Sequence, residues 1–257
     1  TYPYGMAAYN RIHFRFKNLP VPVPTRQFAI RRYEFDHFLV SRADVKLYQH
    51  RVQRVCRRNG CFIIDDAFRC KWLVGAGGTH CPVYRAFFIG RHSRDPKNCV
   101  AAVEEEFSSQ WRDPRCRLWF FQNRLPGYSW YVPKPNGYLN LGVGGRLSTL
   151  KRQGRTINGH WRMLMEKMTR EGLLDEQRPV PKGHLYFLRG GSDNVQHGKA
   201  LIVGDAAGLA TKDMGEGIGP AVESGKLAAE AIANGRRYSI RPVTRWSAPQ
   251  LLYPVTS

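Results

Sequence analysis

The segment 204–219 holds the residues whose types and spacing are best suited to chemistry. It reads Gly204-Asp-Ala-Ala-Gly208 and, after a short gap, Met214-Gly-Glu-Gly-Ile-Gly219. Residues 200–203 just before it form a continuous apolar run, which is typical of a parallel strand buried on both faces. The carboxyl end of such a strand is where open α/β sheets bind ligands, so Asp205 could accept hydrogen bonds from sugar or ribityl hydroxyls there.

A helix is predicted directly after this loop, over residues 218–232. Small and apolar side chains recur there at helical spacing, and Gly235 follows as a C-terminal cap. The helix N-terminus would offer free N–H groups and a positive dipole end to an anionic atom, and the glycines would let a flat ligand approach the backbone. The pattern predicts a nucleotide-binding unit. The alternative is a tight turn and a helix packed through alanine and glycine.

Two other segments carry recognisable patterns. Residues 72–74 predict a strand that runs into Gly75-Ala-Gly-Gly78, a second glycine-rich loop. Pro126-Gly-Tyr-Ser-Trp-Tyr-Val-Pro133 holds three aromatic residues, Tyr128, Trp130 and Tyr131, which could line an apolar substrate cavity. The alternative is a strand between two prolines whose aromatics fill the core. No catalytic acid and no set of metal ligands stands out.

Strands and helices are expected around these motifs. Strands are predicted at residues 11–17, 46–49, 52–56, 61–64, 98–107, 116–121, 129–132, 138–143 and 184–188. Helices are predicted at 32–43 and 147–171, the second with Trp161, Leu164, Met165 and Met168 on one stripe. Three prolines keep residues 19–25 out of a helix or a central strand. Turn residues between the middle strands predict an antiparallel sheet in a domain of its own.

The predicted fold class is therefore α/β (α+β), with a parallel nucleotide-binding layer and an antiparallel-sheet substrate domain. Residues 1–97 and 189–257 are assigned to the nucleotide-binding domain and residues 98–188 to the sheet domain. The 257 residues are 42% hydrophobic, enough to bury a core. No stretch reaches the roughly 18–20 apolar residues of a bilayer span, so a cytoplasmic protein, or one peripheral to a membrane, is expected.

The charge is unusual. Forty Lys and Arg against 20 Asp and Glu give +20, which suggests an anionic partner such as a phospholipid surface, a phosphorylated substrate or a larger assembly. No nucleic-acid-binding signature accompanies the charge, so nucleic acid is disfavoured. A solvated basic surface is the alternative. The six cysteines lie at irregular spacings without a C-x-x-C pair, which favours buried thiols over disulfides or zinc.

These motifs together resemble the FAD-dependent superfamily of geranylgeranyl reductases and flavin hydroxylases. Gly204-Asp-Ala-Ala-Gly with Gly215-Glu-Gly-Ile-Gly is similar to its second flavin motif. Lys71–His80 resembles the strand that delivers Gly-Ala-Asp-Gly, with Gly77 where Asp is usual, and Arg32-Tyr-Glu-Phe-Asp36 resembles an Arg-x-x-x-Asp element near the flavin. Residues 126–133 resemble the Pro-Gly-Tyr-x-Trp-x-x-Pro segment of the reductase branch.

The resemblance implies an enzyme that uses FAD, with NAD(P)H as an expected electron donor, to reduce a carbon–carbon double bond in an isoprenoid or lipid-linked substrate. The flavin contacts it implies involve Arg32, Gly75, Gly77, Gly204, Asp205, Gly208, Gly215, Glu216, Gly217 and Ile218. The substrate contacts it implies involve Tyr128, Trp130 and Tyr131.

Two other functions stay open at this point. A flavin-dependent monooxygenase or halogenase acting on an aromatic substrate would keep the fold. Halogenases carry a Trp-x-Trp-x-x-Pro segment, whereas Tyr128-Ser-Trp130 occupies that stretch here and favours the reductase branch. A non-catalytic, degenerate subunit retained for binding an anionic partner is the third hypothesis.

The superfamily's opening strand, G-x-G-x-x-G and helix, which hold the FAD pyrophosphate, have no counterpart in these 257 residues. We therefore expect an N-terminal βαβ unit to be absent, FAD binding by this chain alone to be weak, and an oligomer or partner chain to cover the incomplete sheet.

Overall fold

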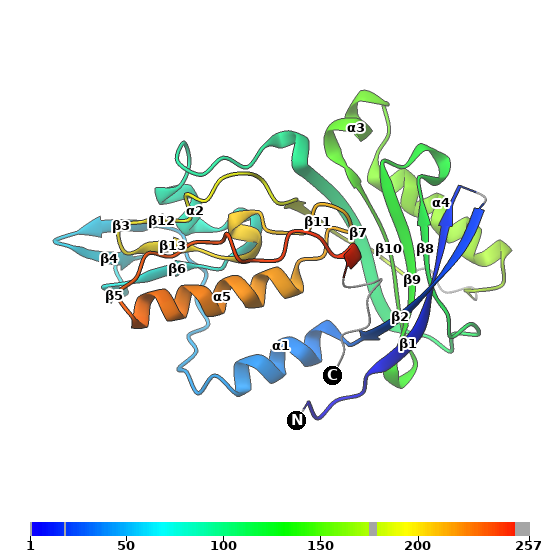
Figure 1. The fold of residues 1–257 in the computed structure, drawn as a ribbon, viewed down its shortest axis with the longest axis horizontal. Helices are drawn as coiled ribbons and strands as arrows, with labels where there is room; N and C mark the ends of the chain where they lie inside the picture. Colours follow the sequence, from blue (N-terminus) through cyan, green and yellow to red (C-terminus); the bar gives the residue numbers. More distant parts are fainter. Residues whose placement is uncertain (1, 18, 175–178, 250–257) are drawn as a thin grey trace. The chain divides into compact units, whose positions relative to one another are not determined.

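The computed structural model describes residues 2–17, 19–174 and 179–249, and the chain divides into two compact units (Figure 1). The first, here the sheet unit, contains Thr1–Leu47 and Val100–His184. The second, here the Gly-Asp unit, contains Tyr48–Cys99 and Leu185–Ala248. The division differs from the one drawn on the sequence, because residues 1–47 group with the large sheet and not with residues 48–97.

The sheet unit is built on a seven-stranded sheet with the order β11-β7-β10-β9-β8-β1-β2. Neighbouring strands from β7 to β8 and the pair β1/β2 are antiparallel, whereas β1 and β8 run parallel. The strands are β1 (Ala7–Phe16), β2 (Leu19–Ala29), β7 (Cys99–Ser108), β8 (Cys116–Phe120), β9 (Gly127–Lys134), β10 (Tyr138–Arg146) and β11 (Lys182–Phe187). The proline-rich β2 lies at the sheet's edge, where a strand tolerates missing N–H groups.

Helix α4 (Ile157–Arg170) packs against β10 and closes one face of this sheet. Its predicted stripe is confirmed: Trp161, Leu164 and Met168 are buried in the same cluster as Leu139 and Leu141 of β10. The helical region splits into α3 (Leu147–Arg152) and α4. A left-handed glycine, Gly154, ends the first, and the Thr156 hydroxyl caps the second by accepting the Gly159 N–H at 3.1 Å.

Helix α1 (Arg32–Ser41) forms as predicted, yet it buries none of its residues. The strand predicted at residues 46–49 is wrong, because this stretch has no regular secondary structure. Its apolar side chains are largely exposed, Leu47 to 68% and Tyr48 to 60%, and the Tyr48 ring makes an edge contact with Phe68 of β5 at 5.2 Å between ring centroids.

The Gly-Asp unit contains two small sheets. In one, β6 (Leu73–Gly75) pairs parallel with β13 (Ala200–Ile202), which also pairs antiparallel with β12 (Gln196–His197). The other is the antiparallel set β3 (Val55–Arg58), β4 (Cys61–Ile64) and β5 (Phe68–Cys70). Helices α2 (Pro82–Phe87) and α5 (Ile218–Ala233) complete the unit (Figure 1). The parallel strand and the long helix predicted from residues 200–232 are thus present.

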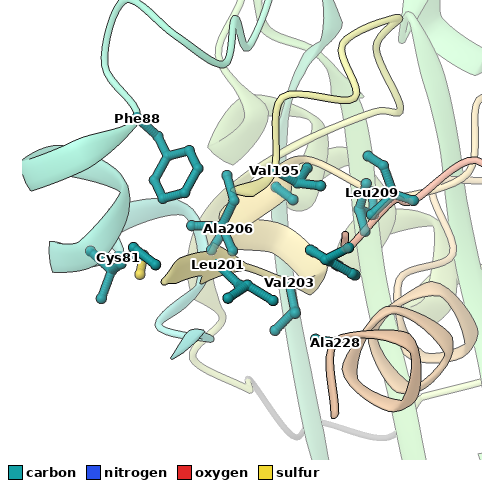
Figure 2. Packing of buried hydrophobic residues seen from close by; sticks show 14 of the residues in the cluster. Cys81, Phe88, Val195, Leu201, Val203, Ala206, Leu209 and Ala228 are labelled. Atoms are coloured by element: carbon teal, nitrogen blue, oxygen red, sulfur yellow. The ribbon is translucent and has the colours of Figure 1, made fainter. Parts of the chain in front are cut away.

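The core of the Gly-Asp unit forms around β13. Ala200, Leu201 and Ile202 are fully buried, as a strand covered on both faces requires. Figure 2 shows Phe88, Val195, Leu209 and Ala228 of the same cluster around this strand. Ala228 and Ala231 are the buried residues that α5 contributes to this cluster.

Two further features bear on function. All six cysteines are free thiols, three of them buried. Among the described residues, no helix is long and apolar enough to cross a membrane, and no group of His, Cys, Asp and Glu is arranged to hold a metal ion.

Candidate functional site

Strand β13 ends in a tight turn that holds α5 against it. The turn begins at η5 (Gly204–Ala207), where Gly204 has a left-handed φ of +53°. The Gly204 N–H donates to the buried Ser224 hydroxyl of α5 at 3.0 Å, and that hydroxyl donates to the Ala221 carbonyl. A Cβ at Gly204 would lie 3.2 Å from the Ala221 Cβ, so glycine allows both the turn and the close approach.

Asp205 lies in this turn, beside the N-terminus of α5. Its side chain is half-buried, and its Oδ1 is 3.6 Å from the position that a Cβ at Gly217 would take. The structure therefore places the Asp205 carboxylate at the carboxyl end of a parallel strand and next to residues 215–219, as the sequence predicts. A carboxylate in that position can accept hydrogen bonds from ligand hydroxyls.

The N-terminus of α5 is capped by its own chain. Gly217 is the N-cap residue, and the Glu216 carboxylate accepts the Gly219 N–H at 2.9 Å. Glu216 thus stabilises the helix start. The N–H groups of Gly217 and Ile218 have no acceptor among the described residues, which leaves two donors at the positive end of the helix dipole.

The loop between η5 and α5 is rigidly bonded. The Thr211 N–H donates to the Glu216 carbonyl, and the Thr211 hydroxyl accepts the Glu216 N–H. The same hydroxyl forms a hydrogen bond with the Ser247 hydroxyl at 2.7 Å. The Asp213 carboxylate accepts three backbone N–H groups, from Met214, Ser247 and Ala248. Burial alone would raise the pKa of Asp213, but these hydrogen bonds outweigh it and lower that pKa. These hydrogen bonds stabilise the conformation of residues 211–216.

The second glycine-rich loop meets the first. Strand β6 is followed by the short helix η1 (Gly78–His80), which contacts η5. Because β6 and β13 are parallel neighbours, the loops that follow these two strands lie side by side. A Cβ at Gly75 would lie 2.7 Å from the Val83 Cβ, so Gly75 serves close packing against α2. A Cβ at Gly77 would lie 3.2 Å from the Cys81 Cα, which makes an aspartate a tight fit there.

The local backbone explains why glycine occupies two further positions of the predicted flavin motif, Gly208 and Gly215. Gly208 has φ +65° and ends η5, and Gly215 has φ +66°. A Cβ at Gly215 would come within 2.6 Å of the Tyr186 hydroxyl oxygen. The positive φ favours glycine at position 215, and a Cβ there would also require the Tyr186 side chain to shift.

Arg32 lies in the sheet unit, at the start of α1. Its guanidinium is 60% exposed and pairs with Asp36 at 2.7 Å, one helical turn away. The neighbouring Arg31 is more deeply engaged, since it bonds Glu34 and Glu106 and stacks 3.5 Å from the Tyr138 ring centroid. The structure thus gives Arg32 a local partner and no buried site of its own.

The three predicted substrate residues divide between the two faces of β9. Tyr128 and Trp130 are half-buried on one face, with ring centroids 5.7 Å apart. Tyr131 is fully buried on the other face, in the cluster under α4, and its hydroxyl donates to the Asp113 carbonyl at 3.1 Å. Its assignment to the same wall as Trp130 is corrected, because successive strand residues point to opposite faces.

The sequence did not reveal a series of hydrogen-bonded polar side chains on the face of the sheet that carries Trp130. The Trp130 indole N–H donates to Asn140 Oδ1 at 2.6 Å, and the Asn140 amide donates to Glu104 Oε2 at 3.3 Å. Glu106, two residues along, accepts from Arg31 and Lys134. A run of glutamates in a sequence is typical of a solvated strand end, so it gives no hint of these bonds. The register of β7, β10 and β9, which no local pattern reveals, brings Glu104 and Trp130 to opposite sides of Gly142.

A buried histidine also supports the Gly-Asp turn. His92 is 3% exposed, and its Nε2 lies 2.9 Å from the Ala207 carbonyl of η5. Burial lowers the pKa of His92, so it stays neutral and donates this bond. Its distance of 115 residues from Ala207 along the chain hides the link from sequence inspection.

Comparisons with known proteins define the class first. No family model matches the chain. A geranylgeranyl bacteriochlorophyll reductase-like structure from Thermoplasma acidophilum superposes with a TM-score of 0.71 and 17% identity over 89% of this chain and 63% of that one. The flavin-dependent halogenase CmlS superposes with a TM-score of 0.63 and 18% identity over 89% of this chain and 46% of that one. The fold is therefore one that reductase-like and halogenating flavoproteins share.

Sequence relatives narrow the class. An uncharacterized protein of Methanosarcina barkeri is 32% identical over 221 residues, 82% of this chain and 54% of that protein. Menaquinone reductase of Mycobacterium tuberculosis is 30% identical over 63% of this chain and 41% of its own length. Digeranylgeranylglycerophospholipid reductase 2 of Methanothermobacter thermautotrophicus is 28% identical over 69% of this chain and 46% of its own length.

These relatives confirm the resemblance drawn from the motifs. The chain is a relative of the geranylgeranyl-reductase and flavin-hydroxylase superfamily. It spans about half the length of the curated relatives that it matches.

Proposed function

We propose that this chain is part of an FAD-dependent oxidoreductase that reduces a carbon–carbon double bond in a hydrophobic, isoprenoid or lipid-linked substrate. One observation carries the proposal: Asp205 and the open N–H groups of Gly217 and Ile218 lie together where β13 ends. The relatives with a named activity are reductases, and both names refer to molecules with long apolar chains.

The residues of the Gly-Asp unit fit a flavin. The Asp205 carboxylate would accept hydrogen bonds from ribityl hydroxyls, and the N–H groups of Gly217 and Ile218 would bind an electronegative ring or phosphate atom. The positive φ at Gly204 and Gly208 keeps side-chain bulk out of the turn. When bound, FAD would supply the hydride chemistry, with NAD(P)H as the proposed donor of electrons.

The sheet unit would supply the substrate wall. Tyr128 and Trp130 stand on a face that also holds Phe120, whose ring centroid is 5.0 Å from that of Tyr128. Trp130 lies over Gly142, where a Cβ would be only 2.0 Å from the indole. This flat aromatic surface suits an isoprenoid chain, and the Asn140 bond fixes the orientation of the indole.

The reaction can be tested directly. The chain, mixed with excess FAD that dithionite keeps reduced under anaerobic conditions, should convert menaquinone or a digeranylgeranylglycerophospholipid to a product heavier by two hydrogens per reduced bond. Mass spectrometry of the extracted lipid gives the readout, and FAD with dithionite but no protein is the control. An unchanged lipid mass in a sample where titration shows that the chain has bound FAD would contradict the proposal.

A second candidate is a flavin-dependent monooxygenase or halogenase, which the fold of CmlS favours. That likeness rests on 18% identity, whereas the named sequence relatives are reductases at 28–30%. An oxygenated or halogenated aromatic product, formed in air with no lipid reduction, would establish it. Failure of both assays, with stable folding and no flavin binding, would point to a non-catalytic subunit that binds an anionic partner.

A further inference from the structure

The sheet unit contains a groove that plays no part in the site described above. Its volume is about 850 Å³, within the range of about 300–1,000 Å³ that small-molecule sites occupy. The end of β1, the turn between β8 and β9, and the C-terminal half of α4 form its walls. Six cations line it: Arg15, Lys17, Arg124, Arg155, Lys167 and Arg170.

Among the residues that the structure describes, acidic side chains are too few to neutralise this groove. Among the described residues, two carboxylates line it, Glu166 and Glu171, against the six cations. None of the six cations forms an ion pair within 4 Å in the part of the chain that the structure describes. An anion entering the groove would therefore meet a strong attractive field at close range.

Lys167 is held in place inside the groove. Its Nζ donates to Gln122 Oε1 at 2.8 Å and lies 3.9 Å from the Trp119 ring centroid. Burial lowers the pKa of Lys167 to about 8, because it outweighs the attraction of the Glu171 carboxylate, and nearby cations such as Arg15 add to the lowering. A solvated surface lysine would show neither feature, so this cation lies in a partly dry site.

The turn at the groove's edge is strained and fixed. Phe121, Asn123 and Arg124 all have left-handed backbones, with φ of +57°, +51° and +60°. Arg155 donates to the Asn123 carbonyl at 2.5 Å, and Gln122 donates to the Lys17 carbonyl at 3.0 Å. Non-glycine residues hold such conformations only where their surroundings impose them. The two walls of the groove are thus tied to the turn, and the cations are preorganised.

We propose that this groove binds a diphosphate or a comparably charged phosphoryl group. Four of the six cations are arginines, whose planar guanidinium forks match phosphate oxygens in pairs. The volume exceeds what one phosphate fills, and the net positive charge exceeds what one carboxylate balances. The site does not depend on the flavin assignment, because all of its residues belong to the sheet unit.

The test is calorimetric titration of the full chain with inorganic pyrophosphate at about 0.15 M salt, where screening between distant charges is strong. The groove variant combines Lys17→Gln, Arg124→Gln and Arg170→Gln, all exposed side chains. The matched control combines Arg26→Gln, Lys151→Gln and Arg162→Gln, which are exposed, lie in the same unit and remove the same charge outside the groove.

We expect the groove variant to bind pyrophosphate at least about tenfold more weakly than the wild type, because it loses charge-assisted hydrogen bonds. The control should stay within about twofold, since its charges lie beyond close contact. Glu166→Gln combined with Glu171→Gln should tighten binding. Absence of binding to the wild type, or equal weakening in both triple variants, would overturn the proposal.

Vesicles distinguish the two sources of such a group. Phosphatidylcholine vesicles with and without phosphatidic acid present the same phosphate chemistry on a lipid. If the ligand is a lipid headgroup, the groove variant loses binding to the acidic vesicles, and pyrophosphate competes with them. If it is a soluble phosphorylated compound, pyrophosphate binds while the acidic vesicles bind the groove variant and the control alike.

Discussion

The two faces of the seven-stranded sheet use aromatic residues in different ways. On the face under α4, Tyr131 is fully buried among Leu139, Leu141 and Trp161, and its hydroxyl donates one hydrogen bond to a backbone carbonyl. On the other face, the half-buried Trp130 joins a group of aromatic rings to an amide and a carboxylate.

The contrast separates stability from recognition. An apolar, close-packed face contributes to folding through burial, whereas a face that combines flat rings with oriented polar groups has the composition of a ligand wall. Under the proposed function, Tyr131 therefore stabilises the fold, whereas its neighbour Trp130 contacts the substrate. Mutations on each face should have different consequences.

Tyr131 should respond most strongly. Tyr131→Ala should lower the free energy of unfolding by about 3–5 kcal/mol, because it empties a fully buried aromatic site. Tyr131→Phe is the control and should cost only about 1 kcal/mol, the value of one hydrogen bond. Urea unfolding measures both. A loss for Tyr131→Ala no greater than that for Trp130→Ala would show that the two faces are energetically alike.

Trp130→Ala should act on turnover. We expect a smaller loss of stability than for Tyr131→Ala, because a half-buried ring loses less transfer free energy, together with impaired reduction of the lipid substrate and retained flavin affinity. Steady-state kinetics and flavin titration on the same preparation separate these quantities. Unchanged turnover with a large fall in melting temperature would assign Trp130 to the core.

A smaller effect concerns pH. Burial lowers the pKa of His13, His92 and His160 below the usual 6.5. As pH falls through about 6.5, the unfolded chain takes up these protons first, so the free energy of unfolding should decrease. Urea unfolding at pH 7.5 and 5.5 tests the sign. The slope should be shallower in His92→Gln, and equal or greater stability at the lower pH would contradict it.

Local signals predicted the segment from β13 to α5 well. The apolar run of β13, the glycines at positive φ and the helical spacing of α5 all act within a few residues of one another. The hydrophobic stripe of α4 is equally local. In these cases, the interactions that form the element involve residues close together in the sequence.

Long-range pairing could not be predicted in the same way. The parallel contact of β1 with β8, which places residues 1–47 in the sheet unit, joins segments about a hundred residues apart. In Tyr128-Ser-Trp130-Tyr131, three of the four residues are aromatic, so the sequence does not show which side chains point to which face of the sheet. Glu104 meets Asn140 only through the register of β7 and β10. The contribution of Arg32 to a flavin site remains a prediction.

The flavin content of the purified chain tests how well these residues bind FAD by themselves. Because the 257 residues hold no G-x-G-x-x-G anchor for the pyrophosphate, we expect the purified chain to carry little flavin and to associate with itself or a partner. Absorbance at the flavin bands, with light scattering for mass, gives both quantities. A monomer isolated with stoichiometric yellow flavin would contradict this expectation.

Titration with FAD decides whether the turn after β13 binds the flavin through Asp205. Asp205→Asn should weaken FAD binding by about tenfold to a hundredfold, because it removes a charged acceptor of hydrogen bonds. Glu230→Gln, an exposed carboxylate toward the other end of α5, should leave the affinity unchanged. If both variants bind FAD as the wild type does, at unaltered stability, Asp205 is not a flavin ligand and the site lies elsewhere.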